Sequence, residues 1–236
     1  MKLLMHTCCA PCSVYCIEEL RKEGIEPTVY WYNPNIHPYM EYKARRDCLK
    51  EYTKAINVQA IFEEEYGLDE FCKEAVKNIE ARCVNYCYPV RLRKTFEYAK
   101  EHGYDAVTTT LLYSIYQKHD FIKHLMEQYS KEYGIDFLYR DFRVGFWEGH
   151  QKAHDLGLYM QKYCGCIFSE EMRYYNRNST KPSIPNDYEI PREPRMQVKK
   201  IENKEEYIDL LLEADPSKDM IHKYLNDSDV YALKKE

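Results

Sequence analysis

The sequence lacks any apolar run that approaches the ~20 residues a membrane-spanning helix needs, which excludes an integral membrane protein. Residues 1–5 lead almost directly to Cys8, too short a stretch for a secretory signal, so we expect a cytoplasmic protein without a membrane partner. Excess positive charge is absent as well, because 34 Lys and Arg against 39 Asp and Glu give a formal net charge of -5. A protein that coats nucleic acid through bulk charge is thereby excluded, and any polyanion must meet a local basic patch.

Hydrophobic residues make up 44% of the 236 residues and charged residues 31%, a profile typical of a globular protein. Apolar and β-branched runs predict strands at 1–6, 28–32, 59–63, 106–111 and 135–139. Helical spacing of apolar residues predicts helices at 13–21, 42–56, 68–79, 89–100 and 121–133, and a final one at 148–156. This alternation indicates an α/β fold with a mainly parallel sheet that is covered by helices on both faces.

The loops that follow the strands of such a sheet gather along one edge, where open α/β folds bind their ligands. Four of these loops carry sulfur-bearing or polar side chains, at 8–12, 32–35, 110–111 and 141–143. We therefore expect the functional site at that edge.

The composition divides the chain into three parts. Residues 1–176 form a cysteine-rich domain, and 177–195 form a proline-rich linker with four prolines among polar residues. Residues 196–236 predict a small β-α-α-β appendage that weakly resembles the start of a GNAT-type acetyltransferase domain and is incomplete as such a domain. The glycine-containing pyrophosphate-binding segment of that family is absent, so we infer no acetyl-CoA chemistry.

Cysteine is the residue in excess, with ten in the chain. Seven of them fall into three tight groups, namely Cys8, Cys9 and Cys12, Cys83 and Cys87, and Cys164 and Cys166. In a long chain without an export signal, such thiols favour metal binding over structural disulfides. The isolated Cys16, Cys48 and Cys72 are interpreted as structural thiols.

The spacings within the groups restrict what each can bind. Cys9 and Cys12 can converge around a turn, and Cys83 and Cys87 share one face of a helix. Gly165 gives the Cys164-Gly165-Cys166 segment the permissive backbone that it needs. Adjacent Cys8 and Cys9 are expected to diverge, so that one ion does not take both.

Zinc is the simpler interpretation of these thiols, but structural zinc usually takes two Cys-x-x-Cys pairs, and only one is present. Seven thiols also exceed the four ligands of a closed zinc site. They can supply one iron–sulfur cluster and leave ligands for a second centre, which favours a redox function.

Several further motifs accompany the cysteines in a fixed order. They are Cys8-Cys9-Ala10-Pro11-Cys12, the segment 32–38 (YNPNIHP) with Glu41-Tyr42, Arg82-Cys83 with Cys87, Arg91-Leu92, the segment 108–111 (TTTL), Asp141-Phe142-Arg143 and the segment 161–166 (QKYCGC). Over about residues 2–175 the chain thereby resembles the QueH-type epoxyqueuosine reductases.

This resemblance implies reduction of epoxyqueuosine to queuosine in the anticodon loop of tRNA. It also implies a Rossmann-like fold of the HUP type, a [4Fe-4S] cluster and an adjacent second metal ion, expected to be iron. We expect Cys83, Cys87 and Cys166 to hold the cluster together with Cys8 or Cys164, and Cys9 and Cys12 to face the second metal. An external electron donor such as ferredoxin or flavodoxin is then needed.

The HUP resemblance also raises the PP-loop ATP pyrophosphatases as a rival. Those enzymes cradle pyrophosphate with a glycine-containing loop after the first strand. Here residues 8–13 contain no glycine and include Pro11, which lacks an N–H group. Such a segment is a poor nest of backbone donors, so we do not expect ATP binding.

Removal of an epoxide oxygen to leave an alkene requires two electrons and two protons. A metal ion could polarise the epoxide oxygen as a Lewis acid. The catalytic candidates are Tyr32, Asp141 and Arg143, and the candidates for substrate binding are Asn33, Asn35, His37 and Arg91. The candidate contacts to tRNA phosphates are Arg45, Arg46, Arg91, Arg93, Lys94, Lys152, Lys162 and Arg173, with the 24 tyrosines as stacking surface for unpaired bases.

Two other classes of function stay open. The chain could be a zinc-stabilised RNA-binding module without catalysis, or an iron–sulfur enzyme that acts on another nucleobase, for example by removing sulfur.

Overall fold

The structure, a computed structural model, describes residues 1–175, 196–214, 217–225 and 227–235. The chain divides into two compact units, Met1–Lys181 and Pro182–Glu236. In the described ranges no helix is long and apolar enough to cross a membrane.

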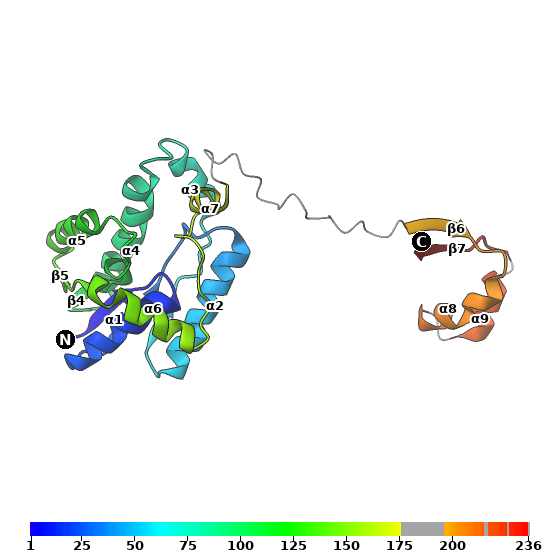
Figure 1. Cartoon of the computed structure of the whole chain (residues 1–236), viewed down its shortest axis with the longest axis horizontal. Helices are drawn as coiled ribbons and strands as arrows, with labels where there is room; N and C mark the ends of the chain where they lie inside the picture. Colours follow the sequence, from blue (N-terminus) through cyan, green and yellow to red (C-terminus); the bar gives the residue numbers. More distant parts are fainter. Residues whose placement is uncertain (176–195, 215–216, 226, 236) are drawn as a thin grey trace. The chain divides into compact units, whose positions relative to one another are not determined.

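The first unit is built on a five-stranded parallel sheet (Figure 1). Its strands are β1 (Leu3–His6), β2 (Pro27–Trp31), β3 (Ala60–Phe62), β4 (Ala106–Thr109) and β5 (Asp136–Phe137), in the order β3-β2-β1-β4-β5. All four neighbouring pairs are parallel. The predicted α/β class is confirmed.

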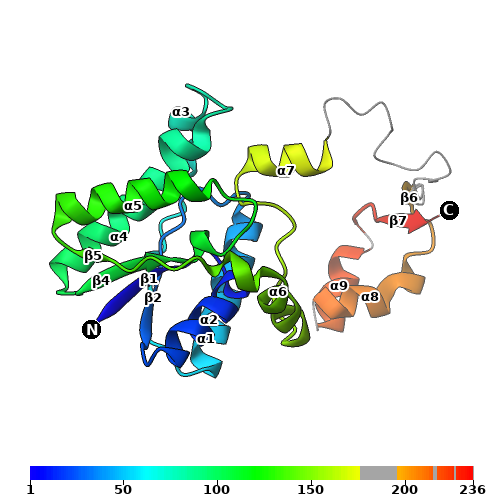
Figure 2. The same ribbon diagram turned by 60° about the vertical axis from the view of Figure 1, so that its left-hand side comes forward.

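Helices cover both faces of this sheet. The helices of the unit are α1 (Ala10–Lys22), α2 (Tyr39–Ala55), α3 (Leu68–Ala75), α4 (Tyr88–Glu101), α5 (His119–Tyr133), α6 (Phe146–Asp155) and α7 (Ile167–Tyr174). One face carries α4 and α5, and α1, α2 and α6 lie on the other (Figure 2). The arrangement is the three-layer, Rossmann-like α/β/α fold that the sequence predicts.

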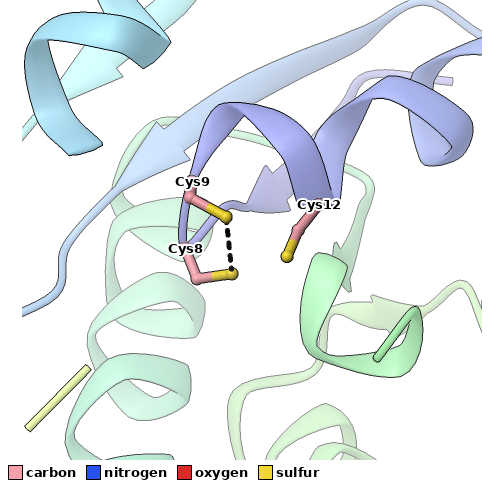
Figure 3. Close-up of side chains that lie close together, drawn as sticks. All are labelled: Cys8, Cys9 and Cys12. Carbon is pink, nitrogen blue, oxygen red and sulfur yellow. Dashed lines mark hydrogen bonds between the residues drawn. The ribbon is translucent and has the colours of Figure 1, made fainter. Parts of the chain in front are cut away.

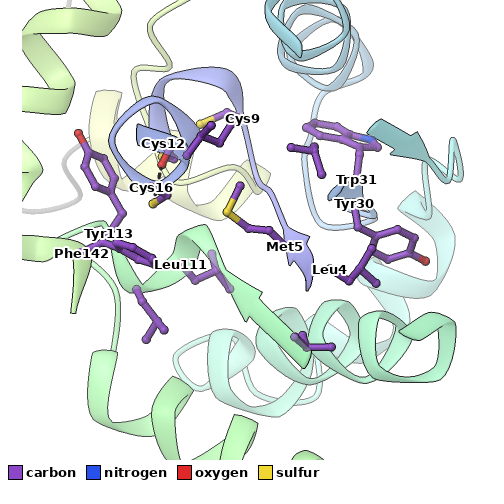
Figure 4. Packing of buried hydrophobic residues seen from close by; sticks show 14 of the residues in the cluster. Leu4, Met5, Cys9, Cys12, Cys16, Tyr30, Trp31, Leu111, Tyr113 and Phe142 are labelled. Atoms are coloured by element: carbon purple, nitrogen blue, oxygen red, sulfur yellow. Dashed lines mark hydrogen bonds between the residues drawn. The ribbon is translucent and has the colours of Figure 1, made fainter. Parts of the chain in front are cut away.

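The core lies between β1 and the helices on either side of it. Every residue of β1 is buried, as expected for a central parallel strand that packs on both faces. Leu4 and Met5 pack in one cluster with Tyr30 and Trp31 of β2, and the cluster continues into the cysteines of α1 (Figure 4). The core thus fixes the loop that joins β1 to α1.

The strand order reverses beside β1, because the chain runs from β1 to β2 and β3 and then crosses to β4 on the other side. In open α/β sheets the crevice at such a reversal is the usual ligand site. Cys8 follows β1 and Thr110 follows β4, and the Cys8 amide donates to Thr110 Oγ1 at 3.2 Å. The structure therefore brings the first cysteine group to this crevice.

Several elements differ from the predictions in their boundaries, and one helix was not predicted. Helix α1 begins at Ala10 and not at residue 13, since Pro11 is tolerated in the first turn, where its missing N–H has no helical partner. Strand β5 is short because only Asp136 and Phe137 pair with β4. Helix α7 is an additional helix beyond the one predicted as final, and none of its residues is buried.

The second unit has the predicted β-α-α-β order. Strands β6 (Met196–Lys200) and β7 (Tyr231–Lys235) pair antiparallel, and between them lie a 3-10 turn (Lys204–Tyr207), α8 (Ile208–Ala214) and α9 (Lys218–Leu225). Ile208, Ile221 and Leu225 form its small core. The predicted linker at 177–195 lies outside the described residues, and the GNAT resemblance stays a prediction.

Candidate functional site

Three thiols converge where β1 ends and α1 begins. Cys8 and Cys9 precede the helix and Cys12 lies in its first turn, so their sulfur atoms turn toward one another (Figure 3). The three sulfur atoms lie within 4.8 Å of one another, and those of Cys8 and Cys9 are 3.8 Å apart. Two sulfur ligands of one tetrahedral ion, each about 2.3 Å from the metal, are also about 3.8 Å apart. These residues, the thiol trio, therefore fit a single metal ion.

The expectation that Cys8 and Cys9 diverge is wrong. Cys9 is extended (φ -173°, ψ 164°), but α1 starts directly after it, and the change of chain direction turns both sulfur atoms toward Cys12. Interactions with the Cys12 and Cys9 thiols hold the pKa of Cys8 well below its ordinary value. Burial raises the pKa of Cys9, and the interaction with Cys8 raises that of Cys12. Within the trio, the pKa of Cys8 is therefore lowered and the pKa values of Cys9 and Cys12 are raised.

The other four predicted ligands form a second group, the thiol quartet of Cys83, Cys87, Cys164 and Cys166. A π-helical turn (Cys83–Cys87) joins directly to α4 and brings the thiols at its two ends into contact. That contact lowers the pKa of Cys83 to about 6 and raises the pKa of Cys87. Cys166 shares a small buried cluster with Cys87, and Cys164 interacts electrostatically with Cys83 and Cys166. These interactions connect cysteines from distant parts of the chain, and their role as metal ligands stays a prediction.

Arg91 of α4 interacts with both the trio and the quartet. It is 3% exposed, and Nε donates to the carbonyl oxygen of Cys87 at 2.6 Å. Its positive charge acts on Cys8 of the trio and on three thiols of the quartet, Cys83, Cys87 and Cys164. No carboxylate forms an ion pair with Arg91 in the part of the chain that the structure describes. Since an isolated buried cation is unfavourable, anionic sulfur is its natural counter-charge.

Polar groups point at four of the seven sulfur atoms. Arg82 Nε donates to Cys166 Sγ at 3.4 Å, and the side-chain amides of Gln117 and Gln161 donate to Cys164 Sγ and Cys12 Sγ, each at 3.4 Å. The Thr110 hydroxyl donates to Cys8 Sγ at 3.6 Å. Such outer donors are typical of thiolates that bind metal. The donor set therefore fits soft metal centres.

Buried polar contacts fix the loop that carries Cys164 and Cys166. Arg45 pairs with Glu41 at 2.6 Å and donates to the carbonyl oxygens of Cys164 (2.9 Å) and Tyr163 (2.8 Å). Gly165 has a φ of 157°, a conformation that side chains disfavour, as its place between the cysteines predicts. Arg45 therefore holds the loop, and its guanidinium is not a free phosphate contact.

A cavity of about 550 Å³ opens over both thiol groups. Cys8 and Cys12 of the trio and Cys164 of the quartet line it. Aromatic side chains border it, namely Tyr113, Tyr116, Phe146, Trp147 and Tyr163. Among the described residues, Arg45, Lys162 and Arg173 contribute positive charge to its lining, and no Asp or Glu lines it. The cavity is therefore suited to an anionic ligand that reaches the thiols.

The three predicted catalytic residues lie outside the lining of this cavity. Tyr32 is 7% exposed, and its hydroxyl donates to Glu65 at 3.3 Å. Asp141 caps a 3-10 turn (Phe142–Gly145) and pairs with Arg143 at 2.6 Å. The Arg143 guanidinium lowers the pKa of Asp141 to about 2. Their predicted role in proton transfer stays a prediction.

The predicted substrate-binding residues are buried close to the thiols. Asn33 donates to the carbonyl oxygen of Thr7 at 2.9 Å, and the amide of His37 donates to Gly165 at 2.8 Å. Asn33, Asn35 and His37 are each at most 3% exposed, and none of them lines the cavity. The contacts of Asn33 and His37 join the loop after β2 to the two cysteine loops.

Sequence patterns missed the aromatic border of the cavity. Its residues come from separate segments, 113–116, 146–147 and 163, and no spacing rule connects them. Trp147 at the start of α6 carried the clearest available signal, an aromatic pair Phe146-Trp147 after a glycine. The predicted helix begins only at residue 148, so neither residue of this pair received a role from the sequence.

Comparison with known proteins identifies the family. The family model described as "Epoxyqueuosine reductase QueH" matches residues 3–172. An epoxyqueuosine reductase QueH of Dehalococcoides mccartyi is 37% identical over 178 residues, which cover 75% of this chain and 97% of that protein. Those of Haemophilus influenzae and Thermotoga maritima are 33% and 32% identical over 71% of this chain, and over 71% and 89% of their own lengths. The resemblance that the motifs predict is confirmed, and the chain belongs to the QueH family of epoxyqueuosine reductases.

Proposed function

We propose that the protein reduces epoxyqueuosine to queuosine in the anticodon loop of tRNA. Family membership supports the reaction, and one observation on this chain carries the proposal. The cavity that reaches both thiol groups is bordered by aromatic rings and by Lys162 and Arg173, and the structure describes no acidic residue in its lining, although the whole chain is acidic. Such a cavity suits a nucleobase attached to a phosphate backbone.

We propose that the thiol quartet holds a [4Fe-4S] cluster and that the thiol trio holds a second metal ion, expected to be iron. In such a cluster each thiolate binds a different iron, so its sulfur ligands need not crowd one point. Within the described ranges the trio alone is compact enough for three thiols to share one ion. Of the two alternatives for the fourth cluster ligand, the contacts favour Cys164, since Cys8 lies with the trio.

The reaction takes two electrons and two protons, and it turns the epoxide into an alkene and one molecule of water. When bound, the cluster supplies electrons one at a time, and the second metal supplies a Lewis acid for the oxygen. An external donor such as ferredoxin or flavodoxin has to deliver the electrons. The chain's own contribution is to orient the base over Cys8, Cys12 and Cys164 and to neutralise backbone charge with Lys162 and Arg173.

Tyr32, Asp141 and Arg143 are kept as proposed acid–base residues, and Asn33, Asn35, His37 and Arg91 as proposed substrate contacts. The burial of Tyr32, Asn33, Asn35, His37 and Arg91 and the pairing of Asp141 with Arg143 favour a first role in shaping the site. We place the reaction in the cytoplasm, where tRNA is modified.

The direct test incubates the anaerobically purified protein with tRNA that contains epoxyqueuosine and a strong chemical reductant. Nucleoside analysis should show queuosine formed at the expense of epoxyqueuosine. Unchanged tRNA from an iron-loaded preparation would reject the proposed reaction. A zinc-loaded protein that binds the tRNA without converting it would support the binding module instead.

A further inference from the structure

A pair of exposed aromatic rings stands at the mouth of the cavity. Trp147 is 71% exposed and Tyr116 is 79% exposed, and both line the cavity that Cys8 and Cys164 also line. The other tryptophan of the chain, Trp31, is fully buried. Large aromatic rings that stay in water beside a cavity are typical of a surface that binds a partner.

These two rings are held by a buried third ring. Phe146 is 8% exposed, and its centroid lies 5.1 Å from that of Trp147 and 5.8 Å from that of Tyr116. Both exposed rings meet Phe146 nearly edge-on, at 80° and 82°. Phe146 is itself fixed by Tyr113, whose hydroxyl donates to the Phe146 carbonyl oxygen at 2.8 Å. The exposed rings therefore stand on a rigid support and lose little freedom on binding.

Positive charge adjoins the rings. Lys162 and Arg173 line the same cavity, and neither forms an ion pair with a carboxylate among residues 1–175. On α6, Glu148 is already paired with Lys152 at 2.9 Å. Aromatic faces beside unpaired cations are the combination with which proteins bind unpaired nucleotides, since the rings stack on bases and the cations contact phosphates.

We propose that Trp147, with Tyr116, is the stacking platform for an unpaired base next to the nucleotide that enters the cavity. Lys162 and Arg173 then contact the phosphates on either side of that base. This inference rests on the proposed function, because it takes the ligand to be the anticodon loop of tRNA. To that function the inference adds the residues that select a single-stranded loop over a duplex. The bases of a duplex are already stacked on one another.

The test measures binding and needs no turnover. The anaerobically purified full chain is titrated with a synthetic RNA hairpin that carries an anticodon loop, and separately with duplex RNA of the same length. Because Trp31 is buried, a change of indole fluorescence on stacking reports on Trp147. We expect the hairpin to quench the emission and the duplex to leave it unchanged.

Variants then assign the effect to the platform. Trp147→Ala should weaken hairpin binding about tenfold, and Trp147→Phe should weaken it less, because a smaller ring still stacks. Met40→Ala is the matched control, since Met40 is 70% exposed and lies outside the cavity lining. Lys162→Gln should weaken binding and reduce the slope of log Kd against log salt by about one.

The proposal is overturned if Trp147→Ala binds the hairpin as tightly as the unaltered protein. It is also overturned if Trp147→Ala slows only turnover driven by a protein electron donor while turnover with a chemical reductant is unchanged. That second result would assign the rings to the donor's docking surface. Binding and quenching without any queuosine product would instead refute the proposed reaction and leave the platform intact.

Discussion

Arg91 Nε donates to the carbonyl oxygen of Cys87 at 2.6 Å, and this buried guanidinium also acts electrostatically on Cys8, which follows strand β1. One side chain thereby connects the thiol trio with the thiol quartet. Because no carboxylate pairs with it in the described residues, its counter-charge has to come from sulfur or from the metal centre that sulfur binds.

Replacing Arg91 by methionine should therefore alter the metal centre more than the fold around it. A nearby cation stabilises the reduced, more negative cluster, so its loss should lower the reduction potential by on the order of 100 mV, equivalent to about 2 kcal/mol for one electron. A spectroscopic redox titration measures the shift. Arg93→Met is the control, since Arg93 on the same helix is exposed and pairs with Glu132. Equal potentials in both variants would contradict this role.

Cysteine substitutions separate ligands from bystanders. Cys166→Ala should lose cluster iron, because Cys166 is buried beside Cys87 and accepts a hydrogen bond from Arg82. Cys72→Ala should retain it, because Cys72 is exposed on α3 and belongs to neither thiol group. Iron and acid-labile sulfide are counted in both proteins after anaerobic purification. Equal iron contents would overturn the ligand assignment.

His37 should make stability depend on pH below neutrality. Burial lowers its pKa to about 4, and in the described structure neither ring nitrogen has a hydrogen-bond partner. As the pH falls through 6.5 the unfolded state binds the proton first, whereas the folded state binds it only near pH 4, so stability is lost in that window. The loss amounts to about 2 kcal/mol at pH 5.

His37→Phe should remove this part of the pH dependence, because the ring packs on Phe71 at 4.5 Å and on Tyr66 at 5.3 Å and needs no charge there. Urea unfolding gives the free energy of unfolding of both proteins at pH 7.5 and at pH 5, and the change between the two pH values is compared. Acid lability of a metal centre is common to both proteins and cancels in the comparison. Parallel pH profiles would refute the assignment to His37.

Asp141 offers a test between catalysis and local structure. Its carboxylate pairs with Arg143, which keeps it ionised at neutral pH, and it lies outside the cavity lining. Asp141→Asn should lower the free energy of unfolding by about 1 kcal/mol or less, because the pair is partly exposed and asparagine can still cap the turn. A true general acid would instead lose about 100-fold or more in turnover. Steady-state rates with the chemical reductant decide between the two roles.

The sequence predicted the fold well where hydrophobic pattern and turn chemistry agree. The apolar strand β1, the proline-containing turn after it and the alternation of strands and helices define the sheet and its ligand edge. Helix α7 escaped prediction because it is only eight residues long, shorter than the roughly ten or more residues over which apolar spacing indicates a helix. The divergence expected of Cys8 and Cys9 was wrong because the start of α1 sets their directions.

The cysteine set could be found from composition and spacing, but its division into two groups could not. That division depends on the electrostatic interaction of Cys164 with Cys83 and Cys166, a tertiary relationship. The aromatic mouth of the cavity likewise depends on the packing of Phe146 between Trp147 and Tyr116. A contact between residues far apart in the chain leaves no spacing pattern in a single sequence.

The account depends above all on these thiols binding iron and sulfide. Metal analysis of the anaerobically purified chain tests this most directly, by counting iron, zinc and acid-labile sulfide per chain. We expect about four to five irons, about four sulfides and little zinc, in a brown protein. One zinc per chain without iron or sulfide would contradict the account.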